Sequence, residues 1–336
     1  MEIRFIKPEE EGVLEKFVKK HRHGSIEQTF SWGVLQTSIP GRDAMFAFGV
    51  FDEEKLVASM LLIRQHMRWG KHWLWCPRGP LLPGGKKGEE AWKLMEVAAR
   101  DLAKKEGDVF MRVEPGAPVG ADFPLEGRAV KTSYMPQNTL LLDLKDDLEG
   151  IRKQMAQKGR YNIKQAHKLG IYVKEGGIDD LDDFYEILEE TAERDGFHLH
   201  EKDFYKQFFE LLGDKARLFL AHHDHDLLGG ILVTYFGNTA TYYFGASSNK
   251  QRQKMAPYAM QWHAIQEAKT HGMKTYDFLG VAPEGDSGHV LAGVTQFKTR
   301  FGGERIAYHK PRVFVYKSAW YWFSRAAKYA GRLLRR

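Results

Sequence analysis

The sequence has very little cysteine: Cys76 is the only one in 336 residues, so no disulfide can form within the chain. Long apolar runs are also lacking, because lysine or arginine interrupts every hydrophobic stretch before the roughly 18 residues needed to cross a bilayer. Residues 1–7 are charged where a secretory signal would be apolar. These absences predict a protein that stays in the cytosol, either in solution or peripheral at the inner face of the membrane.

Extremes of composition are missing as well. Hydrophobic residues make up 43% of the chain and charged residues 28%, which excludes a disordered, collagen-like or coiled-coil protein. A length of 336 residues exceeds the roughly 100–200 residues of one domain, so we expect two. The net charge of +6 favours an anionic partner, such as nucleic acid, a nucleotide-linked substrate or an anionic membrane.

One order of predicted elements occurs twice along the chain. Each copy has a β-hairpin, a further strand, a long amphipathic helix and a last strand that ends at a loop. The first copy comprises strands at 45–50, 56–63 and 71–76, a helix at 89–106 and a strand at 110–114; the second comprises strands at 217–221, 227–236 and 239–246, a helix at 257–271 and a strand at 275–280. This repetition predicts a tandem duplication.

The repeated order matches the small N-acyltransferase fold, in which the sheet splays apart and an acyl donor lies in the opening. We therefore expect an α/β (α+β) protein made of two tandem GNAT-like N-acyltransferase domains. The first would comprise residues 1–146 plus 311–336, and the second residues 147–310. A basic helical run, residues 148–168, would follow the boundary.

The C-terminal stretch, residues 313–336, is aromatic and apolar first and then basic. It has two interpretations. The helix at its end either lies on an anionic membrane or packs on the first domain with its basic face in water.

Seven short blocks, all in the expected order, resemble the Fem-type (FemABX) peptidoglycan aminoacyltransferases. They are FSWG at 30–33, CPRGP at 76–80, RYNIKQA at 160–166, TAERDGF at 191–197, YFGASS at 243–248, DFLGV at 277–281 and GVTQFKTRFGG at 293–303. The resemblance covers nearly the whole chain. It is to the compact type without a helical arm, because nothing between residues 172 and 310 has the length or heptad pattern of such an arm.

The resemblance implies an enzyme that needs no cofactor. Family members transfer an amino acid from aminoacyl-tRNA to the side-chain amine of the peptidoglycan stem peptide, on a nucleotide-linked or a lipid-linked precursor. The implied partners are thus aminoacyl-tRNA and that precursor. Peripheral contact with the membrane through the basic C-terminal tail is the first of the two interpretations of residues 313–336. The sequence selects neither the amino acid nor the type of precursor.

The resemblance also implies roles for single residues. Lys298 would be the catalytic cation at the reacting ester or the 3′ end of the tRNA, beside Phe297 as a substrate-binding residue. Arg194 would bind the diphosphate of the precursor, although it is equally suited to pairing with Asp195. Tyr243 would hydrogen-bond the precursor peptide, with a half-buried core tyrosine as the alternative.

A departure from the family occurs in the first block. Related sequences carry a lysine a few residues after the tryptophan, where it would meet the diphosphate. Here Trp32 is followed by Gln36, and a glutamine donates a hydrogen bond to phosphate without supplying charge. Trp32 and Gln36 are still expected to bind the precursor.

Candidate contacts to tRNA phosphates are the basic residues Lys158, Arg160 and Lys164 of the helical run, together with Arg300. A solvated helix face explains the same charges.

Two rival functions are open. An acyl-coenzyme A-dependent N-acyltransferase of the GNAT superfamily is disfavoured because the loop at 251–257 has no glycine to cradle a pyrophosphate. A non-catalytic RNA- or membrane-binding protein would have lost Lys298, which is present. No metal is expected, since His222, His223 and His225 lie at a hairpin turn without a partner cluster.

Overall fold

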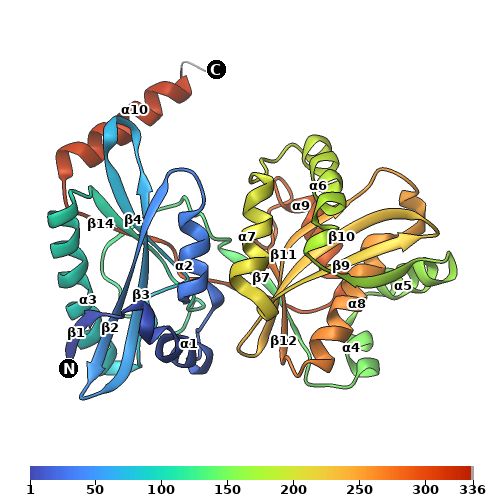
Figure 1. The fold of residues 1–336 in the computed structure, drawn as a ribbon, viewed down its shortest axis with the longest axis horizontal. Coiled ribbons are helices and arrows are strands. Elements are labelled where there is room, and N and C mark those ends of the chain that lie inside the picture. The colour runs from blue at the N-terminus through green and yellow to red at the C-terminus, as the bar shows by residue number, and fades with distance from the viewer. Residues whose placement is uncertain (334–336) are drawn as a thin grey trace. The chain divides into compact units, whose positions relative to one another are not determined.

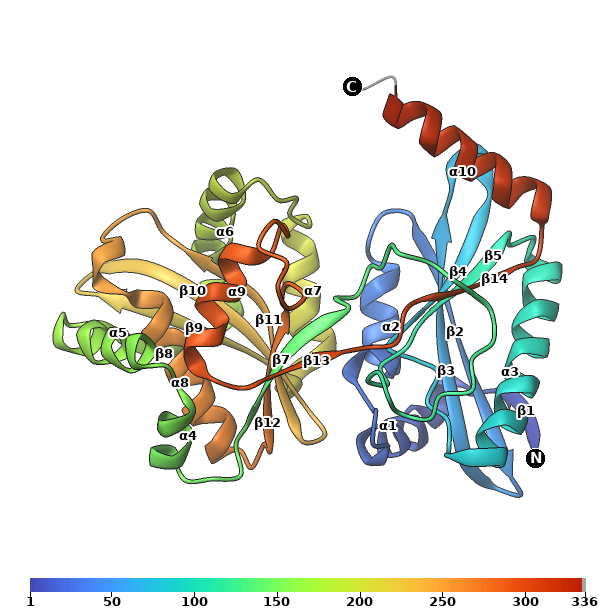
Figure 2. The ribbon, with the colours of Figure 1, turned by 180° about the vertical axis from the view of Figure 1, so that it is seen from behind.

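The computed structural model describes residues 1–333. The chain divides into two compact units: the first unit is Met1–Gln137 with Tyr308–Arg336, and the second unit is Asn138–Ala307. Each is built around its own seven-stranded sheet (Figures 1 and 2). The duplication expected from the sequence is therefore present as two separate hydrophobic cores.

The sheet of the first unit has the order β1-β2-β3-β4-β5-β14-β6. Its strands are β1 (Glu2–Phe5), β2 (Arg42–Asp52), β3 (Lys55–His66), β4 (His72–Pro77), β5 (Phe110–Glu114), β6 (Arg128–Ala129) and β14 (Arg312–Val315). Its helices are α1 (Glu11–Lys20), α2 (Phe30–Thr37), α3 (Gly85–Glu106) and α10 (Ser318–Leu333).

Helices cover both faces of this first sheet because its central strands are apolar on both sides. Along β3, Met60 and Leu62 belong to the core cluster that packs with α3. Leu61 points to the other face, where its methyl groups lie 3.3 Å from the position that a Cβ of Gly33 on α2 would take. Alternate residues of the strand thus face alternate helices, as the period of two requires.

The sheet of the second unit has the order β13-β7-β12-β11-β10-β9-β8. Its strands are β7 (Asn138–Asp143), β8 (Tyr172–Gly176), β9 (Ala216–His223), β10 (Asp226–Phe236), β11 (Thr239–Ser247), β12 (Thr275–Gly280) and β13 (Glu304–Ala307). Its helices are α4 (Leu148–Gln154), α5 (Gln157–Lys168), α6 (Leu181–Asp195), α7 (Lys202–Leu212), α8 (Ala256–Thr270) and α9 (Ala292–Lys298). No helix of this unit exceeds 15 residues, and all of its residues are described.

The two faces of the second sheet are also covered by different helices. Ile231 and Val233 of β10 lie in one core cluster with Met260 of α8. Gly230, which precedes Ile231 and faces the opposite side, lies so close to Phe184 of α6 that a Cβ there would approach its ring to 2.4 Å. Glycine at this position therefore lets α6 approach the sheet.

The boundary between the units lies earlier than the expected position at residue 146. Strand β7 pairs with both β12 and β13. The residues of this strand, Asn138–Asp143, therefore belong to the second sheet. The chain returns to the first unit at Tyr308, close to the expected residue 311.

The prediction of one helix over residues 148–168 is wrong. The structure has two helices, α4 and α5, because Met155 and Ala156 adopt extended backbone angles between them. The side chain of Met155 is buried in the core, and the N–H of Ala156 donates to the carbonyl oxygen of Arg300 at 3.1 Å. Tertiary contacts therefore override the helical pattern here.

No helix within residues 1–333 is long and apolar enough to cross a membrane.

Candidate functional site

The parallel strands β11 and β12 of the second unit diverge along their length. They pair only over Thr239–Thr241 and Thr275–Asp277. Beyond this point β11 stays with β10 as far as Ser247, while β12, which already pairs with β7 at Thr275–Asp277, stays with β7 as far as Gly280, opposite Thr139. This divergence is the splayed sheet that the sequence analysis predicts, and the side chains around it form the candidate site.

Lys298, the last residue of α9, reaches this divergence from the side. Its Nζ donates to the carbonyl oxygen of Gly280 at 2.8 Å and lies 5.4 Å from the ring centroid of Tyr242 on β11. Only 6% of the residue is exposed. Burial lowers the pKa of the Lys298 amine to about 8, against the opposing effect of Asp277. Lys298 is therefore a buried cation that needs little free energy to lose its proton.

Asp277 fixes the end of β12. Its Oδ1 accepts a short hydrogen bond from the Thr139 hydroxyl and a second one, at 2.7 Å, from the N–H of Leu279. Leu279 has a positive φ of 57°, and the ladder between β12 and β7 shifts register between Asp277 and Gly280. This irregularity aims the carbonyl group of Gly280 at Lys298.

Aromatic rings support the helix that carries Lys298. The ring of Phe301, which is fully buried, lies 5.5 Å from that of Phe278 and 5.6 Å from that of Tyr258. Phe297 lies 5.1 Å from Tyr258 and is half-buried. Phe297 thus packs in the core beneath Lys298, and its role as a substrate-binding residue stays a prediction.

Arg194 lies at the end of α6 and contacts the end of β11. Its guanidinium group donates to both carboxylate oxygens of Asp195, at 2.9 and 3.1 Å. It also donates to the carbonyl oxygen of Ser247 at 2.8 Å and to Asn249 Oδ1 at 2.9 Å. Local pairing with Asp195, the alternative from the sequence, is therefore what the structure contains, and a diphosphate would have to exchange with these partners.

Tyr243 is the additional residue of a β-bulge. The register between β10 and β11 pairs Leu232 with Phe244 and Val233 with Tyr242, which leaves Tyr243 unmatched. Its half-buried ring lies 6.0 Å from that of Phe208 on α7. Bulges of this kind re-aim side chains and are common beside active sites.

The first unit contains a cation that the sequence analysis missed. Trp32 and Gln36 of α2 are both buried, and Gln36 Oε1 accepts a short hydrogen bond from the guanidinium group of Arg42. That group lies 5.3 Å from the ring centroid of Trp75, and burial lowers the pKa of Arg42 to about 10. Arg42 lies ten residues after Trp32, so the spacing of the motif does not reveal that a cation contacts Gln36.

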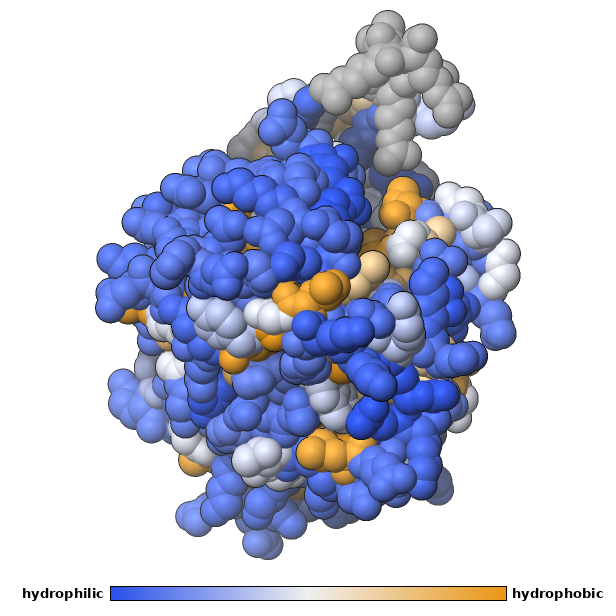
Figure 3. Space-filling view, turned by 90° about the vertical axis from the view of Figure 1, so that its right-hand side faces the viewer, coloured by the Kyte–Doolittle hydropathy of each residue, from blue (hydrophilic) through white to orange (hydrophobic). Residues whose placement is uncertain are grey.

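The candidate tRNA contacts divide into exposed and bonded side chains. Lys158 and Lys164 of α5 are exposed, whereas the Arg160 side chain donates to the carbonyl oxygen of Met155. The backbone of Arg300 lies against α5. Gly159 of this helix packs so closely on it that a Cβ at Gly159 would lie 2.2 Å from the carbonyl oxygen of Arg300. Hydrophilic residues cover most of the side of the second unit on which α5 lies in Figure 1, as Figure 3 shows.

The three histidines at positions 222, 223 and 225 do not form a cluster, and two of them contact other side chains. The ring of His222 stacks on Tyr172 with centroids 5.5 Å apart, and His223 Nδ1 lies 3.2 Å from Asp224. Within the described residues they belong to no group of three metal-ligating side chains.

Two tandem units, each built around its own seven-stranded sheet, define the class of the protein, and comparisons with solved structures agree. The crystal structure of FemX has a TM-score of 0.85 at 18% identity, covering 96% of this chain and 99% of that one. A tandem GNAT protein from the clavulanic acid biosynthesis pathway has a TM-score of 0.56 at 13% identity, covering 94% and 99%. The predicted fold class, two tandem GNAT-like domains, is confirmed.

The family follows from the sequence comparison. The model of the FemAB family matches residues 117–228 and 221–309, which is more than half of the chain, so this protein belongs to the FemAB family. The lipid II:glycine glycyltransferase of Staphylococcus saprophyticus is 23% identical over 368 residues, covering 86% of this chain and 87% of the relative. The predicted class, an acyltransferase-type enzyme, is confirmed.

Proposed function

We propose that this protein transfers an amino acid from aminoacyl-tRNA to the side-chain amine of the peptidoglycan stem peptide. The observation that carries the proposal is the buried Lys298 amine at the splayed end of β11 and β12. Membership of the FemAB family supports it, as does the name of the S. saprophyticus relative, which acts on lipid II.

The reaction needs a cation where Lys298 lies. The amine of the stem peptide attacks the ester carbonyl carbon of the aminoacyl-tRNA, and negative charge develops on the carbonyl oxygen. A fixed positive charge in a site of low dielectric stabilises that oxygen more than water does. The tetrahedral intermediate then expels the ribose hydroxyl of the tRNA, which takes up the proton lost by the attacking amine. Lys298 acts in its protonated form in this scheme.

Lys298 is also well held for this task. The amine donates one of its three N–H groups to Gly280, and the carboxylate of Asp277 is fixed nearby by Thr139 and Leu279. Two N–H groups are then left to aim at an oxyanion. Residues that keep a cation in place before the reaction lower the barrier without reorganising during it.

We further propose that Arg42 and Gln36 bind the diphosphate of the precursor. Arg42 is half-buried, and its guanidinium group is oriented by Gln36 and by the face of Trp75. A fork held in this way suits two phosphate oxygens. Gln36 thus acts through Arg42 and does not need to supply charge itself.

Replacing Arg42 with Met is expected to raise KM for a nucleotide-linked muropeptide about 10-fold or more, because a charge-assisted hydrogen bond to phosphate contributes about 1.5–3 kcal/mol. The value of kcat should change little. Steady-state transfer kinetics measure this. Arg100→Met is the matched control, since Arg100 lies on α3 and pairs with Glu96. An unchanged KM in the Arg42 variant would exclude the diphosphate role.

The tRNA is proposed to lie along α4 and α5. A surface groove there is lined by Arg152, Lys153 and Arg160, together with residues of α8. Exposed Lys158 and Lys164 continue the positive charge along α5. Such a stripe suits a phosphate backbone, and its contribution to binding falls as salt rises.

The reaction itself is tested by single-turnover transfer from a panel of charged tRNAs to a nucleotide-linked muropeptide and, separately, to a lipid-linked precursor. Transfer of one amino acid supports the proposal, and the acceptor that reacts faster identifies the precursor. Titration with acetyl-coenzyme A runs in parallel. Tight binding of that compound, with no transfer from any tRNA, would favour the acyl-coenzyme A-dependent alternative.

Contact with the membrane is proposed through α10. Tyr321 and Ser324 are buried and hold the helix to the first unit, whereas Trp322 and Phe323 are about half exposed. Phe323 lies 4.9 Å from the ring of Trp69, which is itself exposed at the tip of the hairpin between β3 and β4. Figures 1 and 2 both show α10 beside this hairpin. The helix therefore packs and still exposes aromatic side chains.

Basic residues surround these exposed rings. Lys71 lies over the ring of Trp320 and Arg128 over that of Trp322, at 4.9 and 4.5 Å, while Arg325 and Lys328 are exposed on α10. Arg335 and Arg336, which the sequence analysis included in the basic face, lie outside the described residues. Interfacial aromatic side chains beside lysine and arginine are typical of peripheral binding to anionic lipid.

The double variant Trp322→Ser with Phe323→Ser is expected to bind vesicles that contain phosphatidylglycerol at least about 10-fold more weakly, because two interfacial aromatic side chains are lost. Sedimentation with vesicles measures this. Substitution is preferable to truncation at residue 311, which would remove β14 from within the first sheet. Val119→Ser, at another exposed apolar residue, is the control. Equal binding by both variants would refute membrane contact through α10.

A further inference from the structure

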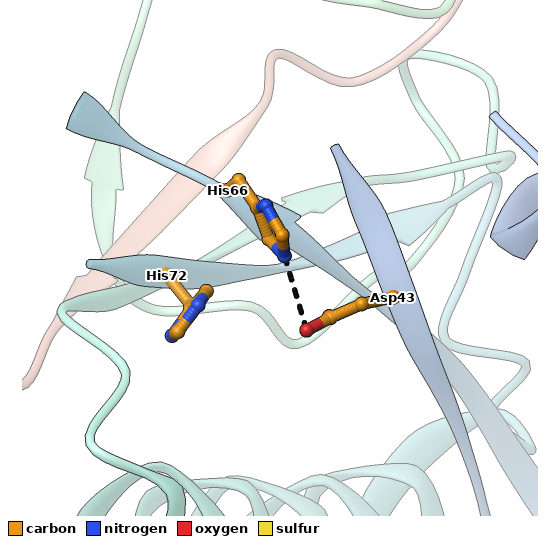
Figure 4. A group of neighbouring side chains, drawn as sticks. All are labelled: Asp43, His66 and His72. Atoms are coloured by element: carbon orange, nitrogen blue, oxygen red, sulfur yellow. Dashed lines mark ion pairs between the residues drawn. The ribbon is translucent and has the colours of Figure 1, made fainter. Parts of the chain in front are cut away.

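Three metal-ligating side chains meet on adjacent strands of the first unit. His66 at the end of β3 and His72 at the start of β4 are directly opposite each other in the ladder. Asp43 lies on β2 at a register shift between Arg42 and Ala44. Figure 4 shows Asp43, His66 and His72 with their side chains gathered on one side of the strands. One ligand atom of each lies within 4.8 Å of the other two.

Contacts within the group and hydrogen bonds from Arg64 fix the positions of Asp43, His66 and His72. His66 Nε2 lies 3.0 Å from Asp43 Oδ2, and the rings of His66 and His72 are 5.0 Å apart. Arg64 donates to both oxygens of Asp43, at 2.9 and 3.1 Å, and to Glu106 at 3.0 Å. A carboxylate has about four lone-pair sites, so two remain beside the guanidinium fork, and one of these two faces His66 Nε2. Ligating carboxylates are commonly held by such outer hydrogen bonds.

All three side chains are of types that bind metals. A neutral imidazole and an ionised carboxylate are the forms that coordinate a cation.

We propose that Asp43, His66 and His72 form a binding site for a divalent transition-metal ion, with Zn²⁺ as the best match. Two imidazole groups and one carboxylate favour Zn²⁺, Ni²⁺ or Cu²⁺ over Mg²⁺ and Ca²⁺, which prefer oxygen ligands. Three protein ligands leave a coordination position for water. The Arg64 guanidinium lies beside the site and opposes the added charge, which sets the expected affinity in the micromolar rather than the nanomolar range.

A bound ion would join β2, β3 and β4 where the hairpin that carries Trp69 leaves the sheet. The side chains that coordinate it come from positions 43, 66 and 72, which do not form a compact sequence motif. This explains why the sequence analysis predicts no metal. None of the three residues is among those proposed to act in the transfer reaction: Lys298 belongs to the second unit, and Arg42, next to Asp43, donates to Gln36.

The test is isothermal titration of Zn²⁺ into chelator-treated full-length protein. We expect one ion bound per chain, at least about 10-fold weaker binding in His72→Gln and in Asp43→Asn, and a rise in Tm with Zn²⁺ that the wild type shows and these two variants lack. The matched control is His225→Gln, which removes a histidine outside the group and should bind like the wild type. Substitution of Co²⁺ reports the ligand set through its visible absorption.

Two results would overturn the site. One is the absence of 1:1 binding to folded wild-type protein, as judged by its circular dichroism. The other is binding that persists unchanged in the His66→Gln, His72→Gln double variant, which would assign the ion to other histidines.

Discussion

Lys298→Met is expected to lower the single-turnover rate of transfer about 100-fold or more, the usual effect of losing one stabilising group at a developing oxyanion. The free energy of unfolding should stay within about 1 kcal/mol of the wild-type value. Loss of the hydrogen bond to Gly280 is offset because a buried charge no longer has to be desolvated. Rapid-quench kinetics and urea unfolding measure the two quantities.

The pH dependence separates a cation from a general base. With a pKa of about 8, Lys298 is protonated below that pH, so a cation predicts a transfer rate that falls as pH rises through about 8. Lys298→Arg should abolish this fall, since arginine stays charged. Lys274→Met, at an exposed lysine of the same unit, is the control for charge loss. A rise through pH 8 that the wild type shows and Lys298→Arg lacks would assign Lys298 to proton abstraction.

Stability should respond to the same group in the opposite direction. The pKa of Lys298 is lower in the folded protein, about 8, than the ordinary value of 10.5. Between these values the unfolded chain binds more protons, so the folded wild type gains stability as pH rises. The Met variant lacks this gain, and the difference between the two proteins measures the desolvation of Lys298.

Phe301→Ala is expected to lower the free energy of unfolding of the second unit by about 3–5 kcal/mol, the range for removing a fully buried aromatic side chain. Phe301 has no exposed surface and packs between Phe278 and Tyr258. Hydrogen exchange of α8 and β12 amides assigns the loss to this unit. Global unfolding alone would mix the two units, because chains with several domains are not two-state.

The control for Phe301 is Phe323→Ala, which removes the same ring from a half-exposed position of α10 and should cost only about 0.5–1.5 kcal/mol, the contribution of its pairing with Trp69. If Phe301→Ala has the same free energy of unfolding as the wild type, the Phe301 ring does not support α9. The fixed position of Lys298 would then need another explanation.

Periodicity sufficed for most of the repeated core. The sequence predicts strands at 110–114 and 275–280 with the bounds of β5 and β12, because both segments are rich in aromatic and aliphatic residues and end at loop residues. Strands β7 and β14 were not predicted. Each pairs with strands remote in the sequence, for example β14 with β5, so no local sequence pattern predicts it.

The candidate site was predictable to a smaller extent. A motif that resembles a known family led to Lys298, but no pattern showed that its amine bonds to Gly280 or that Thr139 holds Asp277, because these contacts join residues 18 and 138 positions apart. Arg42 was missed for the same reason. Its link to Gln36 and Trp75 depends on how α2 lies on the sheet, which the spacing of tryptophan and lysine in relatives does not encode.

Strand β14 lies between β5 and β6, and the chain reaches it only after the whole second unit has been made. During synthesis the first unit therefore cannot complete its sheet until Arg312–Val315 has left the ribosome. The usual order, in which the N-terminal domain folds first, is reversed here. All strands of the second unit have been synthesised before β14, the strand that pairs with β5 and β6, becomes available. Until then, the nascent first unit exposes two unpaired strand edges, which makes it the part of the newborn chain most in need of a chaperone.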